Sequence, residues 1–299
     1  MKTALHSVSY AGVWPGQARL GLDEFLVRAK TLGFNAVMLM AKRPHLSPLD
    51  HQTEARGRLR QRLADLGLHV TCLAGYTDFC LGADRPDIPS REMQILYVRE
   101  LCEIARDLNC GLVRVFTGFD HAAATHDQQW NWCVAALQEC ARHAAPLGVT
   151  VGVQNHHDVA GHWQSLLDLL ADVHEPNCKA MFDAWAPALH GDDLAEVARR
   201  LVPHMVHTTV ADYVRRPRFR YQPALVNFTR ETDAVRAVPM GEGFIDYRTF
   251  FRALREAGYE GYVAYEMCSP LRGGGGEANL DRCARRFLEF MNQAGEPGA

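Results

Sequence analysis

Short apolar runs alternate eight times with longer amphipathic segments, and this rhythm limits the fold more than any other feature of the chain. The apolar runs lie at 3–9, 35–41, 69–75, 111–116, 149–155, 178–183, 205–212 and 261–266. The segments between them carry apolar residues at helical spacing, as Leu22, Phe25 and Leu26 do after the first run. Repeated strand–helix units form parallel sheets. Eight such units in 299 residues predict a single α/β domain over residues 1–299, folded as a closed (β/α)8 TIM barrel.

The main alternative to a barrel is a doubly wound open sheet. Such a sheet normally has a glycine-rich phosphate loop after its first strand, and residues 9–21, SYAGVWPGQARLG, match that loop poorly. The barrel is therefore favoured.

One connection is much longer than the others. Residues 212–243 separate the seventh predicted strand from its helix, far beyond an ordinary connection, so we expect a long loop there. Arg215 and three further arginines lie among aromatic residues in this segment. The sequence leaves two roles open for it, a lid that recognises an anionic or aryl-bearing substrate and a contact in a homo-oligomer.

Charge and hydropathy argue against several classes of protein. The net charge of -3 and the pI near 6.5 argue against nucleic acid or an anionic membrane as the main partner. No apolar run has the length of a membrane span, and the N-terminus lacks the apolar region of a signal peptide. The nine cysteines are scattered without a CxxC pair. This pattern favours reduced thiols and a cytoplasmic location.

Polar side chains end four neighbouring strands, where TIM barrels place their chemistry. Because strand side chains alternate between the barrel interior and the helix layer, Gln154 is expected to point up the barrel axis. Asp183 ends the next strand, His207 shares the inward face of the following one, and Glu266 ends the last. Such oxygen and imidazole groups suit Mn²⁺ or Mg²⁺, and also Zn²⁺ or Co²⁺. Alone, Asp183 and Glu266 are explained equally well as helix caps or ion-pair partners, and His207 is better explained as a hydrogen-bonded core histidine. Gln154 alone could tie down a loop, so the predicted metal site depends on the shared placement of the four residues.

The last strand–helix unit carries the most specific motif, MGEGFIDYRTFFRALREAGYEGYVAYE at residues 240–266. Together with VQNHHD (153–158) and MFDAW (181–185), it resembles the sugar phosphate isomerase/epimerase superfamily of xylose-isomerase-like barrels. The resemblance covers nearly the whole chain. It implies one metal held by Glu, Asp, His and Glu, and sugar-like substrates. It also implies aldose–ketose isomerisation or epimerisation, with dehydratases and lyases as relatives.

Two positions differ from the pattern of that family. The strand-five glutamate is Gln154, whose amide oxygen can bind a metal but which cannot take up a proton at neutral pH. The strand-seven histidine, counted back from Asp212, falls at Thr209, and His207 lies about 6–7 Å deeper along the strand. The first difference argues against epimerisation by two opposed glutamates and favours one-base isomerisation or β-elimination through Glu266. The second leaves the metal site incomplete unless a bulge or a shifted register raises His207.

Further residues are candidates for proton transfer and for substrate binding. His156 is a candidate second proton carrier, because imidazole titrates near neutral pH, and His157 a candidate for binding substrate, although a solvated or capping histidine explains each equally well. Arg114 is expected to point inward, where it would bind substrate or, equally well, pair with a buried acid such as Glu266. Arg215 is a further candidate for binding substrate. Arg272 lies in the glycine-rich loop after the last strand, where TIM barrels often bind phosphate, although a flexible loop explains it equally well.

Together these features predict a metal-dependent isomerase or epimerase acting on a sugar, keto-sugar or related polyol. Glu266 and His156 would move a proton α to a carbonyl, and Gln154, Asp183, His207 and Glu266 would hold the metal. Two alternatives stay open. One is a lyase or dehydratase acting on a keto-sugar or 3-keto-glycoside, and the other is a degenerate barrel that binds a sugar without catalysis.

Overall fold

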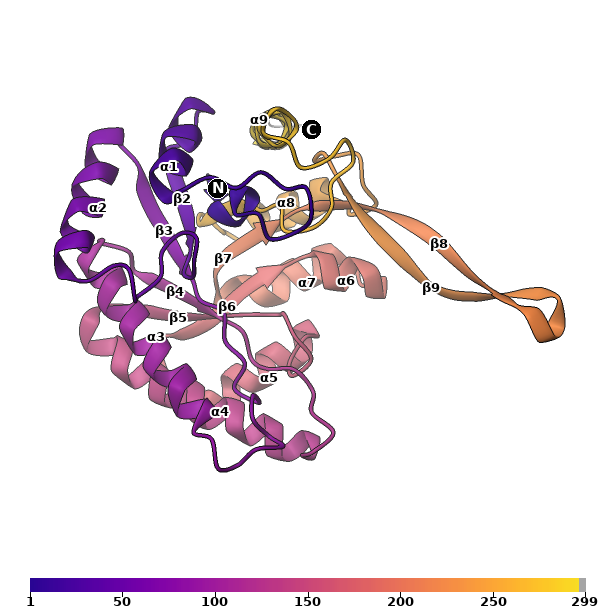
Figure 1. Ribbon diagram of the computed structural model, residues 1–299, viewed down its shortest axis with the longest axis horizontal. Helices are drawn as coiled ribbons and strands as arrows, with labels where there is room; N and C mark the ends of the chain where they lie inside the picture. Colours follow the sequence, from indigo (N-terminus) through magenta and orange to yellow (C-terminus); the bar gives the residue numbers. More distant parts are fainter. Residues whose placement is uncertain (296–299) are drawn as a thin grey trace.

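The computed structural model describes residues 1–295 and shows a closed barrel of parallel strands (Figure 1). The strands adjoin in the order β1, β10, β7, β6, β5, β4, β3, β2. Their bounds are β1 Lys2–His6, β2 Ala36–Met40, β3 His69–Ala74, β4 Leu112–Val115, β5 Thr150–Gln154, β6 Cys178–Asp183, β7 Met205–Val210 and β10 Tyr262–Tyr265. The predicted (β/α)8 barrel is thus confirmed. Residues 296–299 lie outside the described residues, so the predicted domain extent of 1–299 stays a prediction.

Helices cover the outside of the barrel (Figure 1). They are α1 Leu22–Thr31, α2 Thr53–Leu66, α3 Ser90–Asp107, α4 His126–Ala144, α5 Trp163–Val173, α6 Trp185–His190, α7 Leu194–Leu201, α8 Tyr247–Glu256 and α9 Glu277–Gly295. Short 3₁₀ turns lie at Ser7–Tyr10, Ala145–Leu147, Val202–His204 and Pro223–Leu225. The six-residue α6, directly after β6, was not predicted, because one and a half turns are too short to show helical periodicity.

The two larger of the three hydrophobic clusters in the described residues follow from strand alternation. Val151 and Val153 of β5 belong to the large cluster between the strands and the helices. Ala4, Met181 and Ala264 belong to the smaller cluster inside the barrel. The inward set is filled by small and medium side chains at its lower levels, as in a packed TIM-barrel core. Most polar side chains on the same inward face, such as Gln154 and Asp183, therefore lie towards the strand ends.

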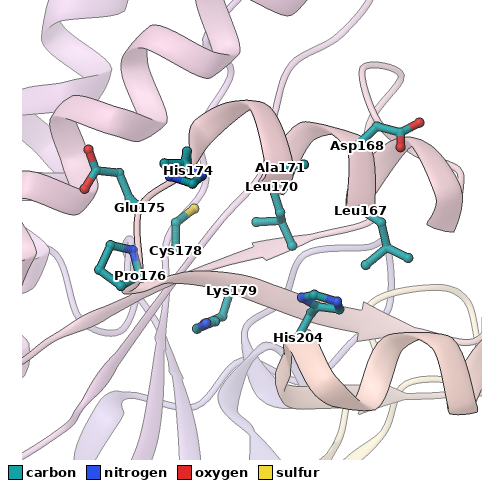
Figure 2. A pocket seen from close by; sticks show the side chains of 10 residues that line it. All are labelled: Leu167, Asp168, Leu170, Ala171, His174, Glu175, Pro176, Cys178, Lys179 and His204. Carbon is teal, nitrogen blue, oxygen red and sulfur yellow. The ribbon is translucent and has the colours of Figure 1, made fainter.

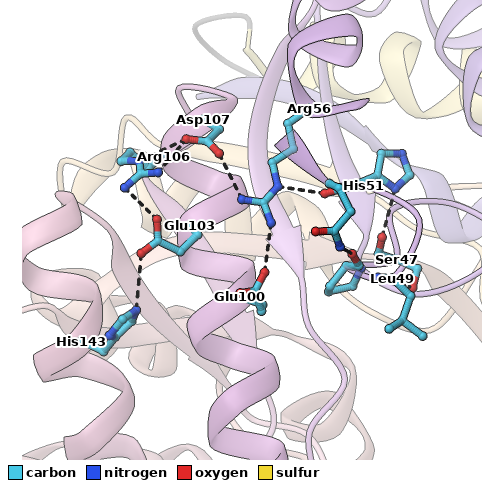
Figure 3. A network of polar contacts seen from close by, with 11 residues as sticks. Ser47, Leu49, His51, Arg56, Glu100, Glu103, Arg106, Asp107 and His143 are labelled. Carbon is cyan, nitrogen blue, oxygen red and sulfur yellow. Dashed lines mark hydrogen bonds and ion pairs between the residues drawn. The ribbon is translucent and has the colours of Figure 1, made fainter. Parts of the chain in front are cut away.

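An ionic network fixes three helices on the outer wall (Figure 3). Arg56 of α2 donates to Glu100 at 3.0 Å and to Asp107 at 3.1 Å, both on α3. Glu103 of α3 lies 3.9 Å from the imidazole of His143 on α4. Because the Arg56 side chain is only 11% exposed, its pairs are screened less than ordinary surface pairs. The network thus holds α2, α3 and α4 together outside β3 and β4.

The expected long loop is instead an antiparallel hairpin that projects away from the barrel (Figure 1). Its strands are β8, Asp212–Gln222, and β9, Asn227–Val238. Pairs such as Arg218 opposite Glu231, 3.0 Å apart, stabilise it across the strands. The loop prediction was wrong because this hairpin buries little of its surface, and therefore lacks the apolar alternation by which strands are recognised.

Candidate functional site

The barrel register places three of the four predicted ligands at the carboxyl ends of the barrel strands, which we call the mouth. Gln154 and Asp183 end β5 and β6, and Asp183 lies opposite Thr209 of β7. Thr209 lies opposite Ala264 of β10, and Glu266 follows that strand with its backbone N–H bonded to Val210. Gln154, Asp183 and Glu266 are buried, with exposed fractions of 1%, 8% and 8%.

Asp183 is held rigidly by its neighbours. The side chain of Asn155 bonds both backbone groups of Asp183, donating to its carbonyl at 2.9 Å and accepting from its N–H at 2.8 Å. The carboxylate accepts a hydrogen bond from the backbone N–H of Trp185 at 2.8 Å, at the start of α6. One carboxylate oxygen is thereby oriented by the first turn of that helix.

Asp183 and Glu266 perturb each other. Burial, and then the charge of Glu266, raise the pKa of Asp183. Burial also raises the pKa of Glu266, whereas the positive charge of Arg114 lowers it. His6, at the end of β1, places its Nε2 3.9 Å from the Glu266 carboxylate. The mouth therefore contains two carboxyl groups in a dry environment, which is the setting in which acid and base roles are tuned.

A guanidinium, an amide and a hydroxyl form a chain of hydrogen bonds beside these carboxyl groups. Arg114 points inward, as its strand parity predicts, and donates to Gln154 Oε1 at 3.0 Å and to the Gly75 carbonyl at 3.0 Å. Gln154 in turn donates from Nε2 to Thr209 Oγ1 at 2.8 Å. The Arg114 guanidinium also stacks 4.1 Å from the centre of the Phe116 ring.

His207 lies deeper in the barrel than the mouth. It is opposite Met181, two residues before Thr209, even though the β6–β7 register shifts just before it. Its Nε2 is 3.2 Å from the Thr71 hydroxyl, and its ring stacks on Tyr262. Burial lowers its pKa to about 3, so the imidazole is neutral. The structure does not bring His207 to the level of Asp183.

The residues at the mouth do not fit a four-ligand metal site as they are arranged. Both polar atoms of the Gln154 amide already have partners: the oxygen accepts from the Arg114 guanidinium, and the nitrogen donates to the Thr209 hydroxyl. Within residues 1–295, the one trio of His, Asp or Glu with ligand atoms within 4.8 Å of one another is His162, His190 and Asp192. Ligation by Gln154, Asp183, His207 and Glu266 stays a prediction without support from this geometry.

His156 and His157 line a cavity of about 230 Å³ together with Asp183 and Trp185. Their Nδ1 atoms are 2.8 Å apart, and both rings pack against Phe116. Burial lowers the pKa of His156 to about 4 and also lowers that of His157. Both rings are therefore neutral near pH 7, and they line a route to the Asp183 carboxylate.

The two remaining predicted arginines are engaged away from the carboxyl groups. Arg215 donates to the Ala188 carbonyl at 2.9 Å and lines a separate cavity of about 590 Å³ between α6 and the hairpin. Arg272 pairs with Glu242 at 3.2 Å, and both side chains are about half exposed. The structure thus places Arg114 and His157 at the mouth, and Arg215 and Arg272 at its margin.

Sequence reasoning missed the roles of Asn155 and Tyr76. Asn155 positions Asp183, and the Tyr76 ring lies under both Arg114 and the Lys42 ammonium. Asn155 directly follows β5 and Tyr76 lies two residues after the end of β3, and that position was the available signal. Their side chains act on other side chains across the barrel, which spacing in the sequence does not reveal.

The Gly-Glu-Gly segment of the closing motif has a structural role at Asp212. The Asp212 carboxylate accepts hydrogen bonds from the backbone N–H groups of Gly241 and Gly243, at 2.9 and 2.8 Å. A Cβ at Gly243 would overlap that carboxylate, so only glycine allows this close approach. The Gly-Glu-Gly segment thereby fixes the connection between the hairpin and α8.

A cavity of about 470 Å³ lies at the opposite end of the barrel (Figure 2). It is lined by Cys178 and Lys179 from the start of β6 and by His204 just before β7. Because TIM-barrel chemistry occupies the other end of the strands, this cavity is not the candidate active site.

The family follows from a match along most of the chain. The family model for the xylose isomerase-like TIM barrel matches residues 26–292. The chain belongs to this family. An L-ribulose-5-phosphate 3-epimerase of Escherichia coli O157:H7 is 23% identical over 252 residues, which cover 82% of each chain.

Solved structures with the same fold include enzymes of different reaction types. A D-psicose 3-epimerase of Clostridium cellulolyticum H10, determined with D-tagatose, has a TM-score of 0.75 at 18% identity, over 99% of this chain and 100% of that one. A probable 3-DHS dehydratase of Bacillus anthracis has a TM-score of 0.72 at 20% identity, over 98% and 100%. At these identities the similarity shows the fold alone. Among the helices in residues 1–295, none combines the length and apolarity needed to cross a membrane.

Proposed function

We propose that this protein is a sugar isomerase or epimerase that moves a proton α to the carbonyl of a keto-sugar or related polyol. The observation that carries the proposal is the pair of buried carboxyl groups, Asp183 and Glu266, at the mouth of a barrel of this family. No step of the proposal passes through a metal, because the residues at the mouth do not fit one as arranged.

Glu266 is the proposed base. It directly follows the last barrel strand, at the end of the barrel where TIM-barrel chemistry occurs, and its carboxylate lies 3.9 Å from His6 Nε2. Asp183, oriented by Trp185, is placed to bind or protonate a substrate hydroxyl. His156 remains the candidate second proton carrier. Its imidazole is neutral near pH 7, so it would accept a proton from the substrate rather than donate one. Binding of substrate by Arg114, His157, Arg215 and Arg272 is part of the same proposal.

The relatives support a sugar-like substrate, but they differ in reaction type, so the reaction is inferred from the residues of this chain. Their names include an L-ribulose-5-phosphate 3-epimerase, a D-psicose 3-epimerase and a probable dehydratase. Gln154 supplies no second base opposite Glu266, which favours one-base isomerisation over two-base epimerisation. The same loss favours the second candidate, a lyase or dehydratase in which Glu266 removes the proton and a β-hydroxyl leaves.

Deuterium exchange tests this proposal. The protein is incubated in D₂O with L-ribulose 5-phosphate, D-psicose and D-tagatose, and deuterium at the carbon α to the carbonyl is followed by NMR. We expect exchange with at least one ketose, and loss of exchange in Glu266→Gln. Glu260→Gln, an exposed glutamate just before β10, is the matched control and should keep the rate. Sugar binding without exchange or elimination would contradict the enzyme and favour the non-catalytic barrel.

We propose that the hairpin contacts a second copy of the chain. Its tip exposes Phe219, Tyr221, Leu225, Val226 and Phe228, with exposed fractions of 50–79%. Six arginines and three carboxylates give residues 212–238 a charge of +3, which leaves -6 on the rest of a chain whose total is -3. The hairpin is therefore complementary in charge to the barrel of a second copy of the chain. An exposed apolar patch of this kind marks a contact surface.

Sedimentation velocity tests the oligomer. The double variant Leu225→Ser/Phe228→Ser should shift the protein to monomer, while Leu49→Ser, an equally exposed leucine on the barrel, should not. An unchanged sedimentation coefficient in the double variant would contradict this role of the hairpin.

The cytoplasmic location stays a proposal that rests on the cysteines. All nine are free thiols, and eight of them are buried. Even Cys80 and Cys133, whose sulfur atoms are 3.9 Å apart and share a hydrogen bond, are not joined by a disulfide. Unpaired cysteines in this number are typical of a reducing compartment.

A further inference from the structure

The two positions at which this chain differs from its family's ligand pattern are bonded to each other. Gln154 stands where the family has a glutamate, and Thr209 where it has a histidine. The Gln154 amide donates to the Thr209 hydroxyl at 2.8 Å, and the two residues are 1% and 0% exposed. A buried amide and a buried hydroxyl each need a partner, and here each supplies the other's. The pair is thus a self-satisfied polar contact in place of two metal ligands.

The side-chain oxygen of Gln154, which the bond to Thr209 leaves free, binds the guanidinium of Arg114. The Gln154 oxygen accepts from Arg114, which is only 2% exposed and whose Nε has no hydrogen-bond partner. Within residues 1–295, no carboxylate lies within ion-pair distance of this guanidinium. The rings of Tyr76 and Phe116 lie 4.8 and 4.1 Å from it and keep water away. A buried, unpaired positive charge is costly to maintain, and such a cost is typical of a functional group.

We infer that Arg114 supplies the fixed positive charge of the mouth and that the mouth works without a bound metal. The chemical part of this inference rests on the function proposed above. When the Glu266 carboxylate takes the proton from the carbon α to a ketone, the C–H electron pair forms a C=C bond and the carbonyl oxygen becomes an enediolate anion. The Arg114 charge stabilises that anion, and the hydroxyl on the deprotonated carbon passes its proton to the former carbonyl oxygen. Glu266 returns its proton to the former carbonyl carbon, so the C=C electron pair forms the new C–H bond and the carbonyl group has moved to the neighbouring carbon. Nothing is oxidised or reduced, and no co-reactant is needed.

The first test measures metal binding and needs no substrate. The purified protein is stripped with EDTA and titrated with Mn²⁺ by calorimetry and by electron paramagnetic resonance. We expect no binding at millimolar Mn²⁺ in the unaltered protein. The double variant Gln154→Glu/Thr209→His, which restores the family's ligand types beside Asp183 and Glu266, should gain a Mn²⁺ site. Thr209→His alone, checked for folding by circular dichroism, provides a second and milder variant.

Two results of this titration would overturn the inference. One is stoichiometric, micromolar Mn²⁺ binding to the unaltered protein that disappears in Asp183→Asn. The other is a folded double variant that still binds no metal, since these two positions would then not be what excludes it.

The second test uses the exchange reaction. In EDTA the unaltered protein should exchange deuterium into the reactive ketose at its full rate. Arg114→Met should lower kcat by about a hundredfold, as the loss of a preorganised charge at an oxyanion does. Arg114→Lys, which keeps the charge, should recover part of kcat with little change in KM. Loss of exchange in EDTA with recovery on adding Mn²⁺ would overturn the inference. Absence of exchange under every condition would instead count against the proposed function, and the Mn²⁺ titration would still decide the metal question.

Discussion

The hydrogen bond between Gln154 and Thr209 makes a quantitative prediction about stability. Thr209→Val removes the hydroxyl and keeps the shape of the side chain, so the amide N–H of Gln154 stays buried without a partner. Leaving a buried donor unsatisfied costs about 1–3 kcal/mol. The added methyl group recovers somewhat less than about 1 kcal/mol. We therefore expect Thr209→Val to lower the free energy of unfolding by about 1–2 kcal/mol.

A double-mutant cycle isolates this bond from the packing of Thr209. Thr209→Ser keeps the hydroxyl and loses only a methyl group, so its cost of about 0.8 kcal/mol should be the same with and without the Gln154 amide. Gln154→Met removes the amide donor. In that background Thr209→Val should be neutral or stabilising, because both partners of this bond are then apolar. Gln154→Met also removes an acceptor of Arg114, but that loss is present with either residue at position 209 and cancels in the cycle. The expected coupling energy between Thr209→Val and Gln154→Met is about 1–2 kcal/mol.

Urea unfolding followed by circular dichroism measures all the variants, with thermal unfolding as an independent check. If Thr209→Val costs the same in both backgrounds, the amide and the hydroxyl are not coupled. The reasoning about a self-satisfied contact in place of two ligands would then be refuted.

Three further outcomes are expected from the structure. Gly243→Ala should destabilise the protein by about 3–5 kcal/mol, because its Cβ would displace the Asp212 carboxylate and break two charge-assisted bonds; Gly57→Ala, with open space around it inside α2, should stabilise by about 0.5–1 kcal/mol in the same thermal melts. Burial lowers the pKa of His45 from 6.5 in the unfolded chain to about 4 in the folded protein. The free energy of unfolding is therefore undiminished above pH 6.5 and decreases as the pH falls towards 4, by about 3 kcal/mol at pH 4. Urea midpoints from pH 7 to 4 should fall less steeply in His45→Gln, and an unchanged slope would contradict this assignment. Asn155→Ala should lower kcat for exchange with little change in KM, because Asn155 positions Asp183 by bonding its backbone groups rather than its carboxylate. A rate equal to that of the unaltered protein would contradict a positioning role.

The barrel and the inward direction of Arg114 and Gln154 were accessible from the sequence. Both depend on local periodicity: eight apolar runs set the number of strands, and alternation within a run sets which residues face inward. The hairpin at 212–238 was not accessible, because its strands are stabilised by pairing with each other and bury little apolar surface. The six-residue α6 was too short for any periodic signal.

In the candidate site, too, some features follow from the sequence and others only from the tertiary structure. The sequence by itself determined which residue types stand at the strand ends, including the amide of Gln154 and the hydroxyl of Thr209 where the resemblance to the family implies a glutamate and a histidine. Only the tertiary structure decided what those residues do, because strand register is a long-range property. It sets Thr209 level with Asp183 and leaves His207 one level deeper. It also brings Arg114, forty residues before Gln154, to the amide oxygen that a metal would otherwise use.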